Sequence, residues 1–357
     1  MWEIHRRRGT LSGAPNFAFD LCANRIDDRN IEGLDLSSAR MVVNGAEPVR
    51  PESVRAFCKR FTKYRFDPGA PAPVYGLAEN SVGLPFPAPG RGLLADRIDR
   101  VALAEKSEAV PVSADRSNAA EIAACGTLIP GHQIRIVDNT GREVADRHQG
   151  RLQFSGPSAT RGYYLNEAKT KQLFDGDWLE TGDLAYVAGG DVYLTGRIKD
   201  IIIRGGRNIY QHEVEAAIGE LDGIRQGCVA VFAAHATDHA EKLVVVAETR
   251  ETSAEVLARL RRDVDTTTLD VAGIAPDDVI RAPPRAVLKM SSGKVRRAAT
   301  GDRYLQGVSK KPAIICRGKS CEWRSRVSDP VFGPRAERSS IMYLPPIGGW
   351  YFRYSQD

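Results

Sequence analysis

Four side chains in this sequence have types and surroundings that suit the binding of a nucleotide and the chemistry of its phosphates. Tyr75 follows a short apolar run, and a tyrosine at a strand end can offer a flat apolar face to a purine ring. Glu79, four residues further on, is a carboxylate of the kind that binds Mg²⁺. Asp183 follows a glycine, and a carboxylate accepts hydrogen bonds from two vicinal hydroxyl groups. Lys294, in a Ser-Ser-Gly loop, can stabilise charge that develops on a phosphoryl group.

Each of these features also has a plainer interpretation. The string around Tyr75 and Glu79 is compatible with a surface turn, and an aspartate after glycine is common in β-turns. The loop that carries Lys294 is compatible with a solvent-exposed basic loop. The elements that must position the four residues therefore decide between these interpretations.

The stretch 196–215 is the one around which the chain is organised. It contains an apolar β-branched run, Ile201 to Ile203, that predicts a short buried strand. Gly205-Gly206 follows and permits backbone angles that other residues resist. A helix is predicted next, because apolar residues recur at i, i+3, i+4 and i+7: Val214, Ala217, Ile218 and Leu221.

The rest of the chain alternates strand and helix patterns. A helix is expected from Ala14 to Cys22, entered through Pro15 at its first turn, and a buried strand from Ala39 to Val43. Between 80 and 124 we expect an irregular excursion with short strands. Further strands are expected at 134–138, 150–156, 191–195, 228–232, 243–247 and 278–282. Helices are expected around 166–173, after the capping box Thr252–Glu255, and after the loop that ends at Pro48, where four residues share one face: Val54, Phe57, Cys58 and Phe61.

Composition places few other limits on the chain. Its 357 residues can hold two domains, and 42% hydrophobic with 27% charged residues is ordinary for a soluble globular protein. The net charge of +5 is dispersed and gives no case for nucleic acid. No apolar run is long enough to predict a transmembrane segment. Six scattered cysteines without zinc-site spacing favour isolated thiols in a reducing compartment, so a cytoplasmic location is expected: Cys22, Cys58, Cys125, Cys228, Cys316 and Cys321.

Four strings stand in order along the chain. They are Tyr-Gly-Leu-Ala-Glu at 75–79, Glu-Thr-Gly-Asp at 180–183, Gly-Arg-Ile-Lys-Asp at 196–200 and Ser-Gly-Lys-Val-Arg-Arg at 292–297. In this order they resemble motifs of the adenylate-forming superfamily, which includes acyl-CoA synthetases, fatty acyl-AMP ligases, peptide-synthetase adenylation domains and luciferases. The likeness covers residues 9–306 and is nearest to fatty acyl-AMP ligases and acyl-CoA synthetases.

The resemblance assigns a role to each matching residue. The backbone of Gly45, Ala46 and Glu47 would lie against adenine. Tyr75 would stack on the adenine, and Gly76 would belong to the same nucleotide-binding set. Asp183 and Arg197 would bind the ribose, Glu79 would bind Mg²⁺, and Lys294 would stabilise the transferring phosphoryl. Asp200 would be the pivot about which a small domain rotates between two half-reactions. Asn16 and Phe17, within Pro-Asn-Phe-Ala-Phe, resemble the acyl-pocket region of fatty acyl-AMP ligases.

The resemblance also implies a fold class and its domains. The expected fold is α/β: the C-terminal part of the large adenylate-forming domain, with a partial sheet and a small β-barrel subdomain, followed by a small mobile α+β domain. The expected boundaries are 1–125 for the remnant of the large domain, 126–196 for the subdomain, 197–200 for the hinge and 201–306 for the small domain. Residues 307–357 match no part of the family, and we expect them to be poorly ordered.

The implied reaction is the ATP- and Mg²⁺-dependent activation of a fatty or other carboxylic acid to an acyl-adenylate. Transfer to a thiol would follow, on an acyl carrier protein or, in the alternative of an acyl-CoA synthetase, on CoA. The family's Ser/Thr/Gly-rich loop with its lysine, which cradles the β- and γ-phosphates of ATP, has no counterpart in this sequence. The chain therefore corresponds to a C-terminal portion, and a third possibility is a non-catalytic nucleotide-binding fragment.

Overall fold

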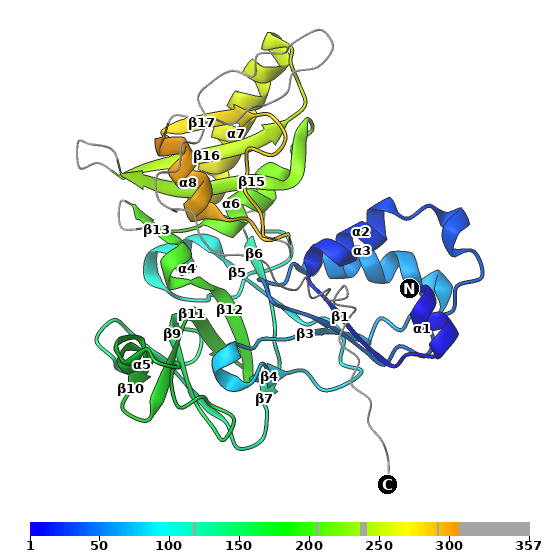
Figure 1. Cartoon of the computed structure of the whole chain (residues 1–357), viewed down its shortest axis with the longest axis vertical. Coiled ribbons are helices and arrows are strands. Elements are labelled where there is room, and N and C mark those ends of the chain that lie inside the picture. The colour runs from blue at the N-terminus through cyan, green and yellow to red at the C-terminus, as the bar shows by residue number, and fades with distance from the viewer. Residues whose placement is uncertain (117–118, 205–206, 236–240, 291–292, 307–357) are drawn as a thin grey trace, which may run out of the picture. The chain divides into compact units, whose positions relative to one another are not determined.

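The structure is a computed structural model that describes residues 1–116, 119–204, 207–235, 241–290 and 293–306 (Figure 1). The Gly205-Gly206 turn, Ser291-Ser292 and the expected tail at 307–357 lie outside the described residues. In the described part, no helix has both the length and the apolar content needed to cross a bilayer.

A three-stranded parallel sheet is built near the N-terminus. Its order is β1 (Leu11–Ala14), β2 (Met41–Asn44) and β3 (Pro71–Pro73). The strands end level with one another, because Ala14 pairs with Asn44 and Asn44 pairs with Pro73. The segments that follow the three strands therefore start from one edge of the sheet, which is where open α/β sheets present ligand sites.

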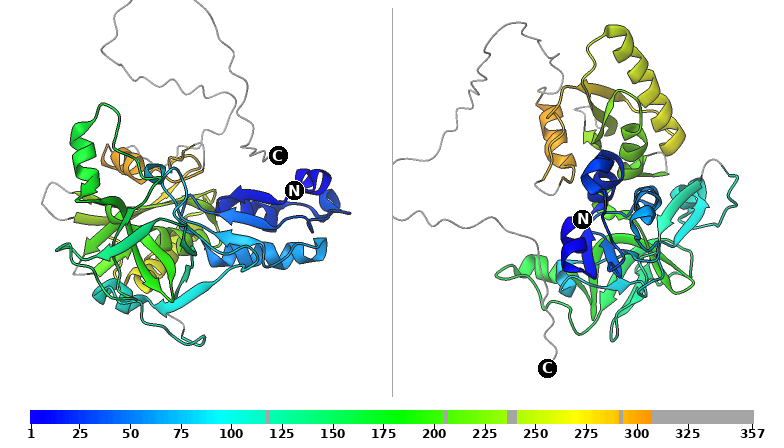
Figure 2. Two further views of the ribbon diagram at one scale, coloured as in Figure 1. Left: turned by 90° about the horizontal axis from the view of Figure 1, so that it is seen from below. Right: turned by 90° about the vertical axis from the view of Figure 1, so that its right-hand side faces the viewer.

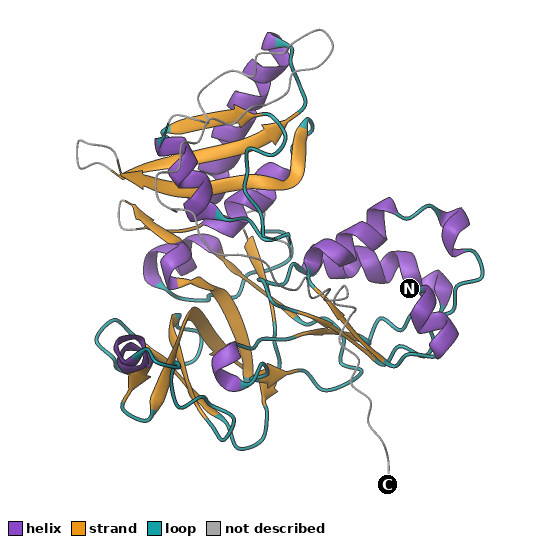
Figure 3. Ribbon diagram, viewed as in Figure 1, coloured by secondary structure: helices purple, strands orange, loops and turns teal. Residues whose placement is uncertain are grey.

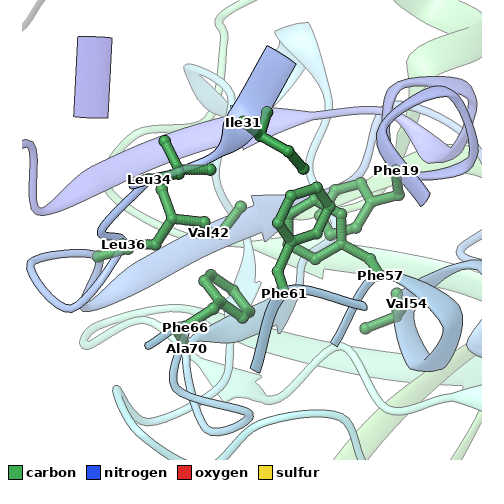
Figure 4. Packing of buried hydrophobic residues seen from close by; sticks show 11 residues of the cluster. Phe19, Ile31, Leu34, Leu36, Val42, Val54, Phe57, Phe61, Phe66 and Ala70 are labelled. Atoms are coloured by element: carbon green, nitrogen blue, oxygen red, sulfur yellow. The ribbon is translucent and has the colours of Figure 1, made fainter. Parts of the chain in front are cut away.

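An aromatic core packs the connecting helices on this sheet. α1 (Trp2–Arg7) precedes β1, α2 (Asn16–Arg25) follows it, and α3 (Pro51–Phe61) follows β2, with 3-10 turns at Asp28–Ile31 and Thr62–Tyr64. Figure 4 shows apolar side chains from these helices and loops converging over Val42 of β2. The ring of Phe57 lies at its centre, with centroid distances of 4.6–5.1 Å to three other rings: Phe19, Phe61 and Phe66.

The middle of the chain forms an antiparallel sheet. Its strands are β8 (Gln133–Val137), β9 (Gly150–Ser155), β10 (Phe174–Asp175), β11 (Trp178–Ala188) and β12 (Asp191–Arg197), with β11 pairing to β9, β10 and β12. Shorter elements surround it: β4 (Pro85–Phe86) with β7 (Thr127–Leu128), β5 (Ala95–Asp99) with β6 (Ala119–Ala123), the 3-10 turn Ala78–Asn80, α4 (Arg100–Lys106) and α5 (Glu167–Leu173) (Figure 3).

The last part is a three-stranded sheet covered on both faces. It consists of β15 (Ile224–His235), β16 (Glu241–Thr249) and β17 (Asp278–Ala282), preceded by the 3-10 turn Ile198–Asp200 and the hairpin β13 (Ile201–Arg204) and β14 (Arg207–Tyr210). Alternate side chains of β15 and β16 enter two separate cores. α6 (Gln211–Gly219) and α7 (Ala254–Ala272) cover one face, and α8 (Arg297–Leu305) covers the other (Figure 2).

Most expected elements are present, and four details differ. The expected helix at Ala14 begins at Asn16, because Leu11–Ala14 is a strand that the sequence reading missed, and Pro15 is the N-cap. The excursion at 80–124 contains α4, which Asp99 caps by accepting hydrogen bonds from Val101 and Ala102. α7 begins as expected, but the Ser253 side chain forms no capping bond. Leu221 lies beyond the end of α6.

The aromatic core predicts one stability effect. Phe61 is completely buried, and Phe61→Ala should lower the free energy of unfolding by about 3–5 kcal/mol, because it removes a packed ring and leaves a cavity. Lys59→Ala, on the exposed face of the same helix, should change it by less than about 0.5 kcal/mol. Urea denaturation followed by circular dichroism measures both, and equal values for the two variants would contradict the packing described.

Candidate functional site

The loop after β2 is held by a single buried asparagine. The side-chain amide of Asn16 donates to the carbonyl of Pro48 at 2.7 Å, and its oxygen accepts from Asn44 at 3.1 Å and from the Arg50 backbone at 3.0 Å. The backbone N–H of Asn16 donates to Glu47 Oε1 at 2.8 Å. Asn16 thus fixes the Gly45–Glu47 loop, a role that the acyl-pocket expectation for this residue did not include.

Phe17 lies differently, with 53% of its surface exposed. A Cβ built on Gly293 would lie 3.8 Å from Cδ1 of Phe17, so the loop that carries Lys294 passes beside the start of α2. The two residues of the acyl-pocket expectation therefore have separate surroundings, one in a buried polar network and one at the surface next to the Lys294 loop.

The loops after β2 and β3 approach each other closely. A Cβ on Gly45 would lie 3.0 Å from the carbonyl oxygen of Val74, and Ala46 has a φ of 68°. A Cβ on Gly76 would lie 1.5 Å from the carbonyl oxygen of Val82, which no larger residue could accept. The backbone geometry after both strands therefore depends on these small residues.

Tyr75, Asp183 and Arg197 meet in one cluster. The hydroxyl of Tyr75 donates to Asp183 Oδ2 at 2.5 Å, and Nε of Arg197 lies 3.0 Å from Asp183 Oδ1. Asp183 and Arg197 are direct partners across β11 and β12, whereas Tyr75 comes from the loop after β3. The carboxylate is 7% exposed and the Arg197 side chain 56%, so the cluster has one solvent-facing side.

The electrostatics of this cluster are set mainly by burial. Desolvation raises the pKa of Asp183, while the hydrogen bond from Tyr75 and the charge of Arg197 act in the opposite direction. Burial and the neighbouring carboxylate raise the pKa of Tyr75 well above its usual value, so the phenol remains a donor. The arrangement is a buried carboxylate that keeps acceptor capacity beside an exposed cation.

Glu79 lies in the 3-10 turn Ala78–Asn80 and is bound by Tyr163. The Tyr163 hydroxyl donates to Glu79 Oε1 at 2.7 Å, and this bond raises the pKa of Tyr163 to about 12. Within the described ranges there is no group of three or more His, Cys, Asp or Glu residues suited to a metal. A single carboxylate fits Mg²⁺ that is held mostly by substrate phosphates and water, as is usual for this ion, and does not fit an all-protein metal site.

Lys294 lies in a short hairpin. Lys289 and Val295 are bridge partners, and the Met290 backbone donates to the carbonyl of Lys294 at 2.8 Å. The Lys294 side chain is partly exposed. Among the described residues no hydrogen bond or ion pair joins it to the Tyr75–Asp183–Arg197 cluster. Polar contacts therefore bring three of the predicted residues together and do not include Lys294.

Asp200, the predicted pivot, is bound by an arginine from the start of α8. Arg297 Nη1 lies 3.1 Å from Asp200 Oδ2, and its Nε and Nη2 bind both oxygens of Glu215 at 2.8 and 2.7 Å. Glu215 also accepts from the Val231 backbone at 3.0 Å. Arg297 therefore links the segment before β13 to α6, three residues after Lys294.

Sequence reasoning missed the roles of Tyr163 and Arg297. Arg297 ends the string 292–297, which resembles the family, whereas Tyr163 lies between the expected strand at 150–156 and the expected helix at 166–173. Their partners are 84 and 97 residues away, at Glu79 and Asp200, and no local pattern announces a pairing at that distance.

Comparison with known proteins supports the resemblance. Residues 2–164 match the family model described as AMP-binding enzyme. The chain is 34% identical over 313 residues to the long-chain-fatty-acid–AMP ligase FadD26 of Mycobacterium tuberculosis, covering 82% of this chain and 53% of that protein. Among solved structures, one from a study of fatty acyl-adenylate ligases from E. coli and L. pneumophila matches with a TM-score of 0.78 and 31% identity, over 86% of this chain and 55% of that one. The McyG A-PCP complexed with phenylalanyl-adenylate matches with a TM-score of 0.68 and 29% identity, over 85% and 51%.

Residues 2–164 of the chain therefore match the AMP-binding enzyme family, and the chain as a whole is related to a fatty acid–AMP ligase. The chain is related to the fatty acyl-AMP ligases, and its fold resembles theirs. These similarities confirm the predicted family resemblance and the predicted fold class. The chain spans about half the length of the curated relatives it matches.

His212, in the first turn of α6, predicts a pH effect on stability. Burial, with the charges of Arg297 and Arg100, lowers its pKa to about 4. An unfolded histidine titrates near 6.5, so the unfolded chain binds a proton that the folded chain excludes, and stability falls as the pH drops from 6.5 to 4. His212→Gln should remove about 3 kcal/mol of this loss.

The comparison is made by urea denaturation from pH 7 to pH 4. His148→Gln is the matched control because His148 is exposed, and its curve should follow that of the unaltered chain. A His212→Gln curve that falls with acid as steeply as the control would show that His212 takes up its proton without cost in the folded chain.

Proposed function

We propose that this chain supplies the adenosine-binding and hinge portions of an enzyme that activates a carboxylic acid, in particular a fatty acid, as its acyl-adenylate. The observation that carries the proposal is the convergence of Tyr75, Asp183 and Arg197 beside the carboxyl ends of the parallel strands. Three residues that are 108 and 14 positions apart in sequence share one carboxylate, in the order and with the residue types that the resemblance implies.

Asp183 is suited to the ribose. Its two oxygens each accept one hydrogen bond or ion pair inside the protein, and a carboxylate has about four acceptor positions. The remaining positions can accept the 2′- and 3′-hydroxyls, and the negative charge strengthens both bonds. Arg197, with its side chain largely exposed, can reach the same ribose. The Gly45–Glu47 loop and the Tyr75 ring would enclose the adenine.

In the proposed reaction, a carboxylate oxygen attacks the α-phosphorus of ATP. The bond from that phosphorus to the bridging oxygen breaks, and pyrophosphate leaves with the electron pair. Mg²⁺, when bound, would supply positive charge to the phosphates, and Glu79 would hold it. Lys294 would stabilise the transferring phosphoryl as a compact point charge, and most of the rate enhancement would come from positioning.

The second step requires a change at the hinge. In the proposal, rotation about Asp200 exchanges the Lys294 loop for a surface that admits a thiol acceptor. The favoured acceptor is a carrier-protein thiol, and support comes from the similarity to fatty acyl-AMP ligases and to the A-PCP structure. The alternative is CoA, as in an acyl-CoA synthetase; consumption of CoA in a thioester assay separates the two acceptors.

A non-catalytic nucleotide-binding role is the second candidate function. It is favoured by one observation, that no Ser/Thr/Gly-rich loop followed by a lysine matches the family's phosphate loop in this sequence. The chain would then bind the nucleoside monophosphate moiety without turning over ATP.

Ribose recognition by Asp183 predicts a specific loss of binding. Asp183→Asn should weaken AMP binding by roughly 10- to 100-fold, since a hydrogen bond to a charged group contributes about 1.5–3 kcal/mol. With 2′,3′-dideoxy-AMP the same substitution should have little effect, because the hydroxyls are absent. Isothermal titration calorimetry measures both ligands. Asp177→Asn, at an exposed position in the turn between β10 and β11, is the control, and an equal loss with both ligands would contradict the assignment.

The role of Lys294 predicts a split between binding and chemistry. Lys294→Ala should lower ATP–pyrophosphate exchange by 100-fold or more while leaving AMP affinity unchanged, because the ammonium acts on the phosphoryl and not on the nucleoside. Arg296→Ala, in the same loop, is the control. Exchange by the unaltered chain that Lys294→Ala abolishes eliminates the non-catalytic role, whereas AMP binding without any exchange establishes it.

A further inference from the structure

A strap formed by residues 158–163 runs alongside the turn that carries Glu79. The Thr160 backbone donates to the carbonyl of Glu79 at 2.7 Å, and the hydroxyl of Ser81 donates to the carbonyl of Ser158 at 3.1 Å. These two bonds join segments that are almost eighty residues apart in sequence. These bonds fix the position of the strap relative to the backbone of the Glu79 turn, without any contribution from the Glu79 side chain.

A buried polar cluster anchors the start of the strap. Ser158 Oγ lies 3.1 Å from Asn80 Oδ1 and 2.7 Å from His132 Nε2, and the Asn80 amide donates to the carbonyl of Gly83 at 2.6 Å. Asn80 is 1% exposed and His132 is 9% exposed. Because satisfied buried polar groups are costly to separate, this cluster rigidifies the link between the Glu79 turn and the strap.

The other end of the strap presents Tyr163 to Glu79. The hydroxyl of Tyr163 donates to Oε1 of Glu79 at 2.7 Å, and the backbone N–H of Tyr163 donates to Oγ1 of Thr170 in α5 at 2.9 Å. Tyr163 is thus bound at its backbone and at its hydroxyl. Among the described residues, Glu79 Oε2 has no hydrogen-bond or ion-pair partner. One oxygen of the carboxylate therefore accepts a hydrogen bond from the protein, and the other is available to a ligand.

We propose that Tyr163 is a positioning residue for the metal: its hydroxyl fixes the Glu79 carboxylate and leaves Oε2 as the ligand for a nucleotide-bound divalent cation. The inference rests on the proposed function, since it assumes that Glu79 binds Mg²⁺. An unrestrained glutamate must lose side-chain freedom when it binds an ion, and the strap removes much of that cost beforehand. Partners that orient a metal ligand in this way typically change metal affinity by 10- to 100-fold.

The test is the Mg²⁺ dependence of ATP binding to the full chain, measured by calorimetry at a series of Mg²⁺ concentrations and in EDTA. Tyr163→Phe should raise the Mg²⁺ concentration for half-maximal enhancement of ATP affinity by about 10-fold. ATP affinity in EDTA should not change, because the substitution removes no contact with the nucleoside. Tyr164→Phe is the matched control, since the adjacent tyrosine is 92% exposed against 40% for Tyr163. Thermal unfolding of each variant checks that the fold is retained.

The outcomes separate this inference from the proposal on which it rests. If Tyr163→Phe has the same Mg²⁺ requirement as the unaltered chain, the positioning role is overturned. If Glu79→Gln abolishes the Mg²⁺ enhancement in the same experiment, the assignment of the metal to Glu79 still holds. ATP binding that is indifferent to Glu79→Gln overturns the metal assignment and the positioning role together, and leaves nucleotide binding in place. Failure of the unaltered chain to bind ATP overturns the proposed function itself.

Discussion

One shared carboxylate holds the site together. Asp183 accepts from Tyr75, which comes from the loop after the parallel strand β3, and pairs with Arg197, which comes from the strand beside it in the antiparallel sheet. A buried carboxylate is costly unless it is hydrogen-bonded and paired, so Asp183 needs both of these partners. Because one partner follows β3 and the other lies on β12, pairing this charge also fixes the loop after β3 against the β11–β12 hairpin.

A second charge network is centred on Arg297 and includes Asp200, the predicted hinge residue. Arg297 donates two hydrogen bonds to Glu215 and one to Asp200, so it is bound more strongly to α6 than to Asp200. Breaking the bond to Asp200 would leave the guanidinium still paired, whereas separating Glu215 from it would strand a largely buried carboxylate. Movement at Asp200 is therefore compatible with an intact base formed by α6, β15 and α8.

The sequence predicted the elements with strong periodicity and the residues carried by ordered motifs. β17 was predicted at its observed bounds, and α3 was predicted from the apolar face that carries Val54, Phe57 and Phe61. The cluster of Tyr75, Asp183 and Arg197 was predicted from the ordered motifs. β1 was missed because Leu11–Ala14 has only four residues and no fully buried side chain, so its pairing with β2 defines it.

The contacts that sequence could not supply are long-range and polar. Nothing local to Asn16 indicates that its amide closes the loop after β2, and nothing local to Tyr163 indicates Glu79 as its partner. Such pairs depend on how the loops fold back on one another, which a periodic pattern does not encode. The resemblance named the residues of the site, and the structure supplied the partners that hold them.

The parallel sheet has a consequence for handling the chain in solution. β1 stands at the end of its sheet, has β2 as its strand partner among the described residues, and carries Leu11 with 63% of its surface exposed. A strand with one open side is a template on which another backbone can add, and an exposed leucine favours such an encounter. If this polypeptide self-associates at high concentration, we expect the contact to form at β1, which lies far along the chain from Asp183 and Arg197.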